Sequence, residues 1–199
     1  MTLRVLLVTP EAVGVPRLAW VDELTAIAGV EGVELTVCGG IHATRAAVAA
    51  RLRCEWDVIL WSGHGAPGRL LLADGPVGAD WLACMMRQQP PGVAVLSACF
   101  SGARDEALHS IAETLSQSSV TCVGMWVGVE DRAAVVYDVE FVRAYAIGGS
   151  VAVAHRVAVA QVAMEYPSQA GAAFLLPGLV NGYGKIAAEL GEIRRRLDL

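Results

Sequence analysis

The chain has 199 residues, of which 55% are hydrophobic and 18% are charged. This length suits one ordinary domain with a sizeable core, and the composition excludes intrinsic disorder, which is rich in charge and poor in apolar residues. Fifteen basic against twenty acidic residues give a net charge of −5. That charge excludes a broad electrostatic footprint for nucleic acid, so we expect no direct nucleic-acid binding.

The sequence does not predict a membrane span or a secretory signal. The most apolar long window, 144–164, is interrupted by Gly148-Gly149, His155-Arg156 and Gln161, whereas a spanning helix needs roughly 18 uninterrupted apolar residues. The N-terminal apolar run stops at Pro10 without a small-residue cleavage site. We therefore expect a cytoplasmic protein that does not contact a membrane.

Five cysteines are scattered along the chain without a Cys-x-x-Cys pair: Cys38, Cys54, Cys84, Cys99 and Cys122. An odd and scattered set argues against both a disulfide framework and a zinc site. We expect reduced thiols and neither a metal nor another cofactor. All of them except Cys99 fall in or beside apolar stretches, which predicts that they lie in the core.

Short apolar runs alternate with longer helical patterns, which is typical of a parallel sheet with helices on both faces. The runs are rich in Val, Leu and Ile without clean alternation, as expected for strands buried on both sides. The expected strands are 3–9, 33–38, 57–62, 93–98, 120–126 and 172–176. The expected helices are 16–28, 44–53, 79–87, 105–116, 132–147, 150–164 and 185–197.

One segment interrupts this alternation. The apolar run 69–73 is followed by Asp74-Gly75, which reads as a strand entering a tight turn and predicts a small hairpin over the edge of the sheet. The chain contains no internal repeat and no low-complexity linker. We expect one domain over 1–180, followed at 181–199 by an arginine-rich C-terminal helix that would suit a connector.

Two expected strands end in residues that can carry catalysis. The strand 57–62 runs into Gly63-His64-Gly65, and the strand 93–98 runs into Cys99. Reactive groups gather at the carboxyl ends of parallel strands, so neighbouring strands would place His64 and Cys99 on one rim. Ser101 and the acids after it suit the start of a helix, whose dipole together with an imidazole favours the reactive thiolate. The N–H groups of Gly65 and Cys99 would then bind an acyl oxyanion.

Each of these two residues also has a plain structural interpretation when it is taken singly. A cysteine at a strand end is often a small buried hydrophobe, and a histidine between glycines is often a turn residue. Their occurrence together favours a catalytic pair. The histidine precedes the cysteine by 35 residues, which disfavours glutamine amidotransferase-like and α/β-hydrolase-like folds because their nucleophile comes first.

A hydrophobic strand ending in Gly-His-Gly, followed by one ending in Ala-Cys, resembles the caspase-like cysteine peptidases of clan CD. Within them the chain resembles the CHAT domain family of bacterial caspase relatives. The segment 70–75 is similar to the hairpin of that family, Leu96-Ser97-Ala98-Cys99 to its cysteine box, and Trp126 with 129–131 to its Trp–Val–acidic segment. The resemblance extends from residue 3 to about residue 176.

This resemblance implies a caspase-like three-layer α/β sandwich, with a mostly parallel six-stranded sheet, helices on both faces and a small hairpin after the histidine. It implies a cysteine endopeptidase whose catalytic dyad is His64 and Cys99, with Gly65 as a backbone oxyanion donor. It also implies a protein substrate, a regulatory sensor domain or partner protein, and a role as effector of a bacterial stress or defence system, antiviral defence included.

In that architecture the substrate pocket lies between the cysteine-bearing strand and the loop after the next strand, here Ser97 on one side and Trp126 to Asp131 on the other. Many basic-specific relatives have an aspartate where this chain has Ser97, and the caspase pentapeptide Q-A-C-R-G is absent. A basic preference would have to come from Glu130 or Asp131. Otherwise these acids cap the helix expected from 132, and the neutral pocket accepts a medium apolar residue.

Two further interpretations stay open. The first is a catalytically silent caspase-like scaffold that binds a partner, which intact dyad residues disfavour. The second is a flavodoxin-like binding module with an incidental cysteine and histidine. That module would need a phosphate-binding loop at the end of the first strand, where 10–14 offers only one glycine.

Overall fold

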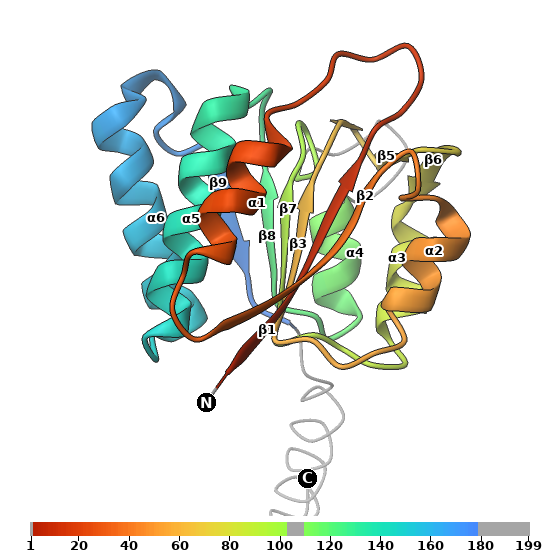
Figure 1. Cartoon of the computed structure of the whole chain (residues 1–199), viewed down its shortest axis with the longest axis horizontal. Helices are drawn as coiled ribbons and strands as arrows, with labels where there is room; N and C mark the ends of the chain where they lie inside the picture. Colours follow the sequence, from red (N-terminus) through yellow and green to blue (C-terminus); the bar gives the residue numbers. More distant parts are fainter. Residues whose placement is uncertain (1, 103–109, 179–199) are drawn as a thin grey trace, which may run out of the picture.

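A six-stranded sheet forms the middle layer of the computed structural model, which describes residues 2–102 and 110–178 (Figure 1). The order across the sheet is β2-β1-β3-β7-β8-β9. Its strands are β1 (Leu3–Pro10), β2 (Val33–Gly40), β3 (Val58–Ser62), β7 (Val93–Ser97), β8 (Cys122–Met125) and β9 (Ala173–Leu176). The first five run parallel and β9 runs antiparallel to β8. The prediction of a mostly parallel six-stranded sheet is therefore confirmed.

Helices cover both faces of this sheet, so the predicted three layers are also confirmed (Figure 1). One face carries α2 (Arg45–Arg51), α3 (Ala79–Met86) and α4 (Ile111–Gln117). The other carries α1 (Trp20–Ala28), α5 (Asp131–Ala146) and α6 (Val151–Glu165), and the short 3-10 turn η1 (Pro167–Gln169) leads into β9.

The central strands form because their side chains are apolar on both faces. Along β1, Val5 and Leu7 enter the core under α1 and α5, while Leu6 and Val8 enter the core under α2 and α3. All four are fully buried. Burial of such a side chain stabilises the fold by about 1.5–3 kcal/mol. The strand gains this energy on both faces, and its sequence therefore shows little alternation of apolar and polar residues.

A second, antiparallel sheet follows the histidine. It consists of β4 (Gly65–Ala66), β5 (Arg69–Leu72) and β6 (Gly75–Gly78). Gly75, which begins β6 directly after the turn, has φ +127°, a backbone conformation that favours glycine. Leu70, Leu72 and Val77 anchor this sheet in the core on the α2 and α3 side. The predicted hairpin is confirmed, with β4 as an additional strand.

Two helices begin four or more residues later than predicted. The helix expected over 16–28 begins only at Trp20, because the residues before it are held by side chains of other elements, as described below. The helix expected over 105–116 begins at Ile111, since Ser110 is extended and forms a capping box with Glu113. Residues 105–109 and the expected helix 185–197, with the connector at 181–199, lie outside the described residues.

Two of the four cysteines expected in the core are buried, namely Cys38 and Cys122. The prediction is wrong for Cys54 and Cys84, which are exposed. Cys54 follows α2 in a surface turn, and α3 turns its apolar residues inward and leaves Cys84 on its outer side. Among the helices of the described ranges, none combines the length and apolarity that crossing a membrane requires.

Candidate active site

His64 and Cys99 follow neighbouring strands at the same edge of the sheet. β3 pairs with β7 in parallel register, with Ser62 opposite Ser97. His64 comes two residues after Ser62, and Cys99 comes two residues after Ser97. Both side chains are half-buried. The sheet thus places the two residues side by side at its carboxyl edge, as the strand pattern predicts.

Gly65 brings the histidine loop into contact with the cysteine loop. A Cβ atom at position 65 would lie 2.5 Å from the carbonyl oxygen of Cys99 and 3.1 Å from the Cβ of Ala98, so a larger residue does not fit. The Leu71 N–H donates to the carbonyl of His64 at 3.0 Å, which makes Gly65 and Leu70 a pair without mutual hydrogen bonds. The N–H of Gly65 therefore points away from β5.

The thiol of Cys99 lies against the loop between β8 and α5. The N–H of Val129 donates to its Sγ at 3.3 Å, and Sγ lies 3.7 Å from the Val129 carbonyl oxygen. One residue further, the Phe100 N–H donates to the Val127 carbonyl at 3.3 Å. These main-chain contacts align the two loops, and the Val129 N–H is a donor that a thiolate sulfur can accept.

The turn that carries Cys99 has an unusual backbone. The Ser101 N–H donates to the Ala98 carbonyl at 3.1 Å, and Phe100 has φ +58°, a left-handed conformation that is rare for a bulky residue. Ser101 is fully buried and secures the turn, because its hydroxyl donates to the Leu96 carbonyl at 2.8 Å and accepts from the Met125 N–H at 3.0 Å. The Ser101 hydroxyl thus joins β7 to β8, and the acids expected with it at a helix start lie outside the described residues.

Strand β9 supports this turn from the other side. A Cβ atom at Gly102 would lie 1.9 Å from the ring of Phe174, so only glycine fits there. The same ring stacks on Trp126 with 4.0 Å between centroids. Trp126 remains about half exposed, next to the exposed Phe100 and Val127. The cysteine is thus bordered by apolar surface.

The ring of His64 is held by a main-chain carbonyl. Its Nε2 lies 2.7 Å from the carbonyl oxygen of Pro16, in the connection between β1 and α1. A carbonyl can only accept, so Nε2 carries the hydrogen and the Nδ1 of the neutral ring keeps its lone pair. The role of Pro16 could not be predicted from the sequence, because any residue type carries a main-chain carbonyl.

The four residues expected to form the substrate pocket lie around the cysteine loop but are bound in different ways. Ser97 is buried and donates from its hydroxyl to the Asp138 carboxyl at 2.5 Å. The exposed Glu130 precedes α5, and its N–H donates to Gln169. Asp131 accepts a 2.7 Å hydrogen bond from the Ala19 N–H. Trp126 stacks on Phe174 of β9. Each of the four residues therefore has a different partner, and no hydrogen bond or ring contact joins these described side chains to one another.

Two buried acids next to this site were not predicted. Glu23 of α1 and Asp138 of α5 are fully buried. Burial raises the pKa of Glu23 to about 7, against the opposing effects of Ser62 and Asp138. Burial, followed by the charge of Glu23, raises the pKa of Asp138 well above its usual range. In the sequence, the position of Asp138 between Tyr137 and Val139 in an apolar stretch was a signal for a buried acid.

A mostly parallel sheet between two helical layers, an antiparallel last strand and a small sheet inserted after the histidine define a caspase-like fold. The first five strands share the order of flavodoxin-like sheets, and β9 with the inserted sheet distinguishes this chain from them.

Neither the family models nor the curated proteins contain a match to this sequence. Solved structures do match, and each covers almost the whole chain. The Arg-specific cysteine proteinase gingipain R aligns with a TM-score of 0.68 and 10% identity over 89% of this chain. The complex of the RgpB pro- and mature domains from Porphyromonas gingivalis aligns at 0.62 and 10% over 88%. Caspase-1 from Spodoptera frugiperda aligns at 0.56 and 11% over 89%. The chain spans 47–48% of the two gingipain chains and 88% of the caspase chain.

Proposed function

We propose that this chain is a caspase-like cysteine endopeptidase with His64 and Cys99 as its catalytic dyad. The observation that carries the proposal is the position of both residues at the carboxyl ends of the paired strands β3 and β7. The contact between Gly65 and the Cys99 carbonyl joins the two loops. This arrangement presents a nucleophile, a base and two main-chain donors on one edge, which is the set that acyl transfer requires.

The proposed reaction uses the chain's own groups in two steps. His64 takes the proton of the Cys99 thiol, and the thiolate attacks the peptide carbonyl to form a carbon–sulfur bond. The N–H groups of Gly65 and Cys99 bind the oxyanion. His64 then protonates the leaving amine as the carbon–nitrogen bond breaks. Water, deprotonated by His64, hydrolyses the acyl-enzyme, which releases a carboxylic acid and restores the thiol.

The Pro16 carbonyl has a definite role in this scheme. Its hydrogen bond to Nε2 of His64 leaves Nδ1 as the nitrogen that exchanges protons with Cys99. When the ring becomes an imidazolium, the same carbonyl oxygen accepts from the charged Nε2–H, and such charge-assisted bonds are stronger than neutral ones. The main-chain carbonyl of Pro16 thus orients the histidine ring, which is the role of the third side chain in a catalytic triad.

The sequence resemblance adds a biological setting to the proposal. CHAT-type proteins serve as regulated effectors, so we place this peptidase in the cytoplasm of a bacterial stress or antiviral defence system. Its substrate would be a partner protein, and a sensor domain or partner would control its activity. The pocket for the residue before the scissile bond would lie between Ser97 and Trp126, beside Glu130 and Asp131.

Two substitutions test the proposal. Cys99→Ala and His64→Ala should each abolish cleavage of a peptide library while thermal unfolding stays cooperative. Because Cys54 and Cys84 are exposed, labelling by a peptidyl acyloxymethylketone should be measured after both are changed to serine. The probe should then label Cys99 and not the Cys99→Ala variant. Retained cleavage in Cys99→Ala would refute the mechanism, and a stability loss of about 2–5 kcal/mol would indicate a purely structural cysteine.

A further inference from the structure

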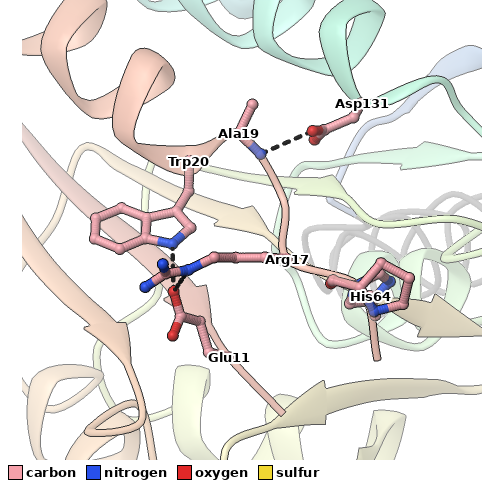
Figure 2. A network of polar contacts seen from close by, with 7 residues as sticks. Glu11, Arg17, Ala19, Trp20, His64 and Asp131 are labelled. Atoms are coloured by element: carbon pink, nitrogen blue, oxygen red, sulfur yellow. Dashed lines mark hydrogen bonds and ion pairs between the residues drawn. The ribbon is translucent and has the colours of Figure 1, made fainter. Parts of the chain in front are cut away.

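We propose that Asp131 and Glu11 are positioning residues for His64, and that both act through the segment between β1 and α1. This inference rests on the proposed function, because it concerns the histidine of the same dyad. Neither carboxylate touches the histidine ring. Each holds a part of the chain that presents the Pro16 carbonyl to the ring. Figure 2 shows Asp131 bonded to Ala19, and Glu11 bonded to Arg17 and Trp20.

The β1–α1 segment (residues 11–19) reaches the histidine because of the sheet order. β1 lies between β2 and β3, so the chain leaves β1 next to the end of the histidine-bearing strand. After a turn with Gly14 at φ +83°, residues 16–19 run without helix or strand until α1 begins at Trp20. A stretch outside regular structure depends on side-chain contacts for its position. Those contacts therefore determine how firmly the Pro16 carbonyl is held in position.

Asp131 fixes the end of the segment that leads into α1. Its carboxylate accepts from the Ala19 N–H at 2.7 Å, across 112 residues of sequence. Ala19 is the N-cap of α1 and offers no side-chain oxygen of its own, so the acid at the start of α5 satisfies that helix end instead. A bond from a main-chain N–H to a carboxylate is charge-assisted. It holds Ala19 three residues from the carbonyl that meets His64.

Glu11 fixes the other end. One of its oxygens accepts from the Arg17 guanidinium at 2.7 Å and from the Trp20 indole at 3.0 Å, as the dashed lines in Figure 2 show. These bonds, that of Arg17 first, hold the pKa of Glu11 below its usual range. The Arg17 side chain is 75% exposed, so solvent weakens this ion pair. We therefore expect Glu11 to contribute less than Asp131.

A loss of this positioning has a specific chemical consequence. Without the Pro16 carbonyl, Nε2 no longer has its acceptor, and the tautomer with hydrogen on Nδ1 gains population. That tautomer cannot take the thiol proton through Nδ1. The effect falls on proton transfer and leaves substrate binding intact. If Asp131 acted as a pocket residue instead, its substitution would change substrate binding and selectivity.

The experiment compares Asp131→Ala, Asp131→Asn and the control Asp22→Ala, whose carboxylate is exposed in the first turn of α1. Nitrogen-15 spectra of ring-labelled histidine are assigned by comparison with His64→Ala. In the wild type we expect the Nε2–H tautomer at His64. Asp131→Ala should shift His64 toward the Nδ1–H form, Asp131→Asn should restore it because an amide oxygen can accept from Ala19, and Asp22→Ala should leave it unchanged.

Kinetics provide the second readout. Asp131→Ala should lower kcat by about 10–100-fold, the range expected for a misplaced catalytic group, with KM changed less than about twofold. Glu11→Ala should show a smaller loss in the same direction. Unchanged His64 resonances in a folded Asp131→Ala, or equal losses in the alanine and asparagine variants, would overturn the inference.

The two proposals can fail separately. The histidine spectra are measured without substrate, so a wild type that cleaves no peptide would refute the proposed function while the tautomer shift still tests the positioning. If Asp131→Ala does not fold, Glu11→Ala replaces it, because its partner Arg17 is exposed and its partner Trp20 is only partly buried. An Nδ1–H tautomer in the wild type would overturn the positioning whatever the activity.

Discussion

Gly65 contacts the main-chain carbonyl of Cys99, so that a single added carbon at position 65 would come within 2.5 Å of that oxygen. The histidine loop and the cysteine loop are therefore fitted to each other through backbone atoms. Backbone cannot be rearranged by a change of rotamer, so the fit fixes the spacing of the two loops. The glycine after the histidine is a requirement of this contact.

The first prediction concerns this contact. Gly65→Ala should push the two loops apart, because the nearest neighbour of the new methyl group is a main-chain oxygen. We expect a loss of about 1–3 kcal/mol in the free energy of unfolding, as for other overpacked sites. The fraction of peptidase activity that is lost should exceed the fraction of the unfolding free energy that is lost. Gly29→Ala is the control, since a Cβ atom there meets its nearest neighbour at an ordinary 3.5 Å. Equal stability of the two variants would contradict the fit.

The second prediction concerns the buried acids Glu23 and Asp138. Burial raises the pKa of Glu23 to about 7 from an ordinary value of 4.5. Between these values the unfolded chain releases the proton that the folded chain retains, so the contribution of Glu23 to stability is greatest below pH 4.5 and is lost as pH rises to about 7. The shift corresponds to about 3 kcal/mol. Denaturant unfolding at several pH values measures this slope.

Substitution isolates the contribution of Glu23. Glu23→Gln should flatten the fall between pH 4.5 and 7, because the amide does not titrate, while Glu34→Gln on the exposed side of β2 should leave it unchanged. The comparison with wild type is necessary because two other groups also titrate. The raised pKa of Asp138 adds a fall of the same sign, and His155 acts in the opposite sense, since burial lowers its pKa. A Glu23→Gln variant with the wild-type slope would show that Glu23 does not carry the shift.

The sequence pattern was sufficient for the layers and for placing His64 and Cys99 at the ends of neighbouring strands. Apolar runs without alternation locate the strands, and Gly-His-Gly and Ala-Cys mark two strand ends that the structure pairs. The sequence pattern could not predict the contacts that hold His64. The bond to Pro16 uses a main-chain oxygen, and the bond between Asp131 and Ala19 joins residues 112 positions apart. Such contacts depend on how α1 and α5 pack, which no local pattern encodes.

Ser101 provides the third prediction. Its buried hydroxyl donates to Leu96 and accepts from Met125, and it thereby holds the turn in which Phe100 adopts φ +58°. Ser101→Ala leaves two buried main-chain groups without this partner, so we expect a loss of about 1–3 kcal/mol in the free energy of unfolding. Labelling of Cys99 should slow as the turn loosens. Ser168→Ala, at the exposed η1, is the control, and a neutral Ser101→Ala would disprove the role of the hydroxyl.

The last prediction concerns the residue before the scissile bond, for which we expect a medium apolar side chain. The Ser97 hydroxyl is committed to Asp138, and the Asp131 carboxylate is committed to Ala19. Trp126 presents a half-exposed ring. Of the acids expected in the pocket, this leaves the exposed Glu130 to face a basic side chain, and an exposed carboxylate contributes little to such a contact.

A peptide library cleaved by the wild type and by Glu130→Gln tests this expectation. The ratio of kcat/KM for arginine to that for leucine should stay below one and should change by less than about threefold on substitution, which is the range of an exposed ion pair. A strong preference for arginine or lysine that collapses in Glu130→Gln would establish an acidic pocket instead. A strong basic preference that survives Glu130→Gln but is lost in Asp138→Asn would place the selecting charge beneath Ser97, because Asp138 is the carboxyl that the Ser97 hydroxyl contacts.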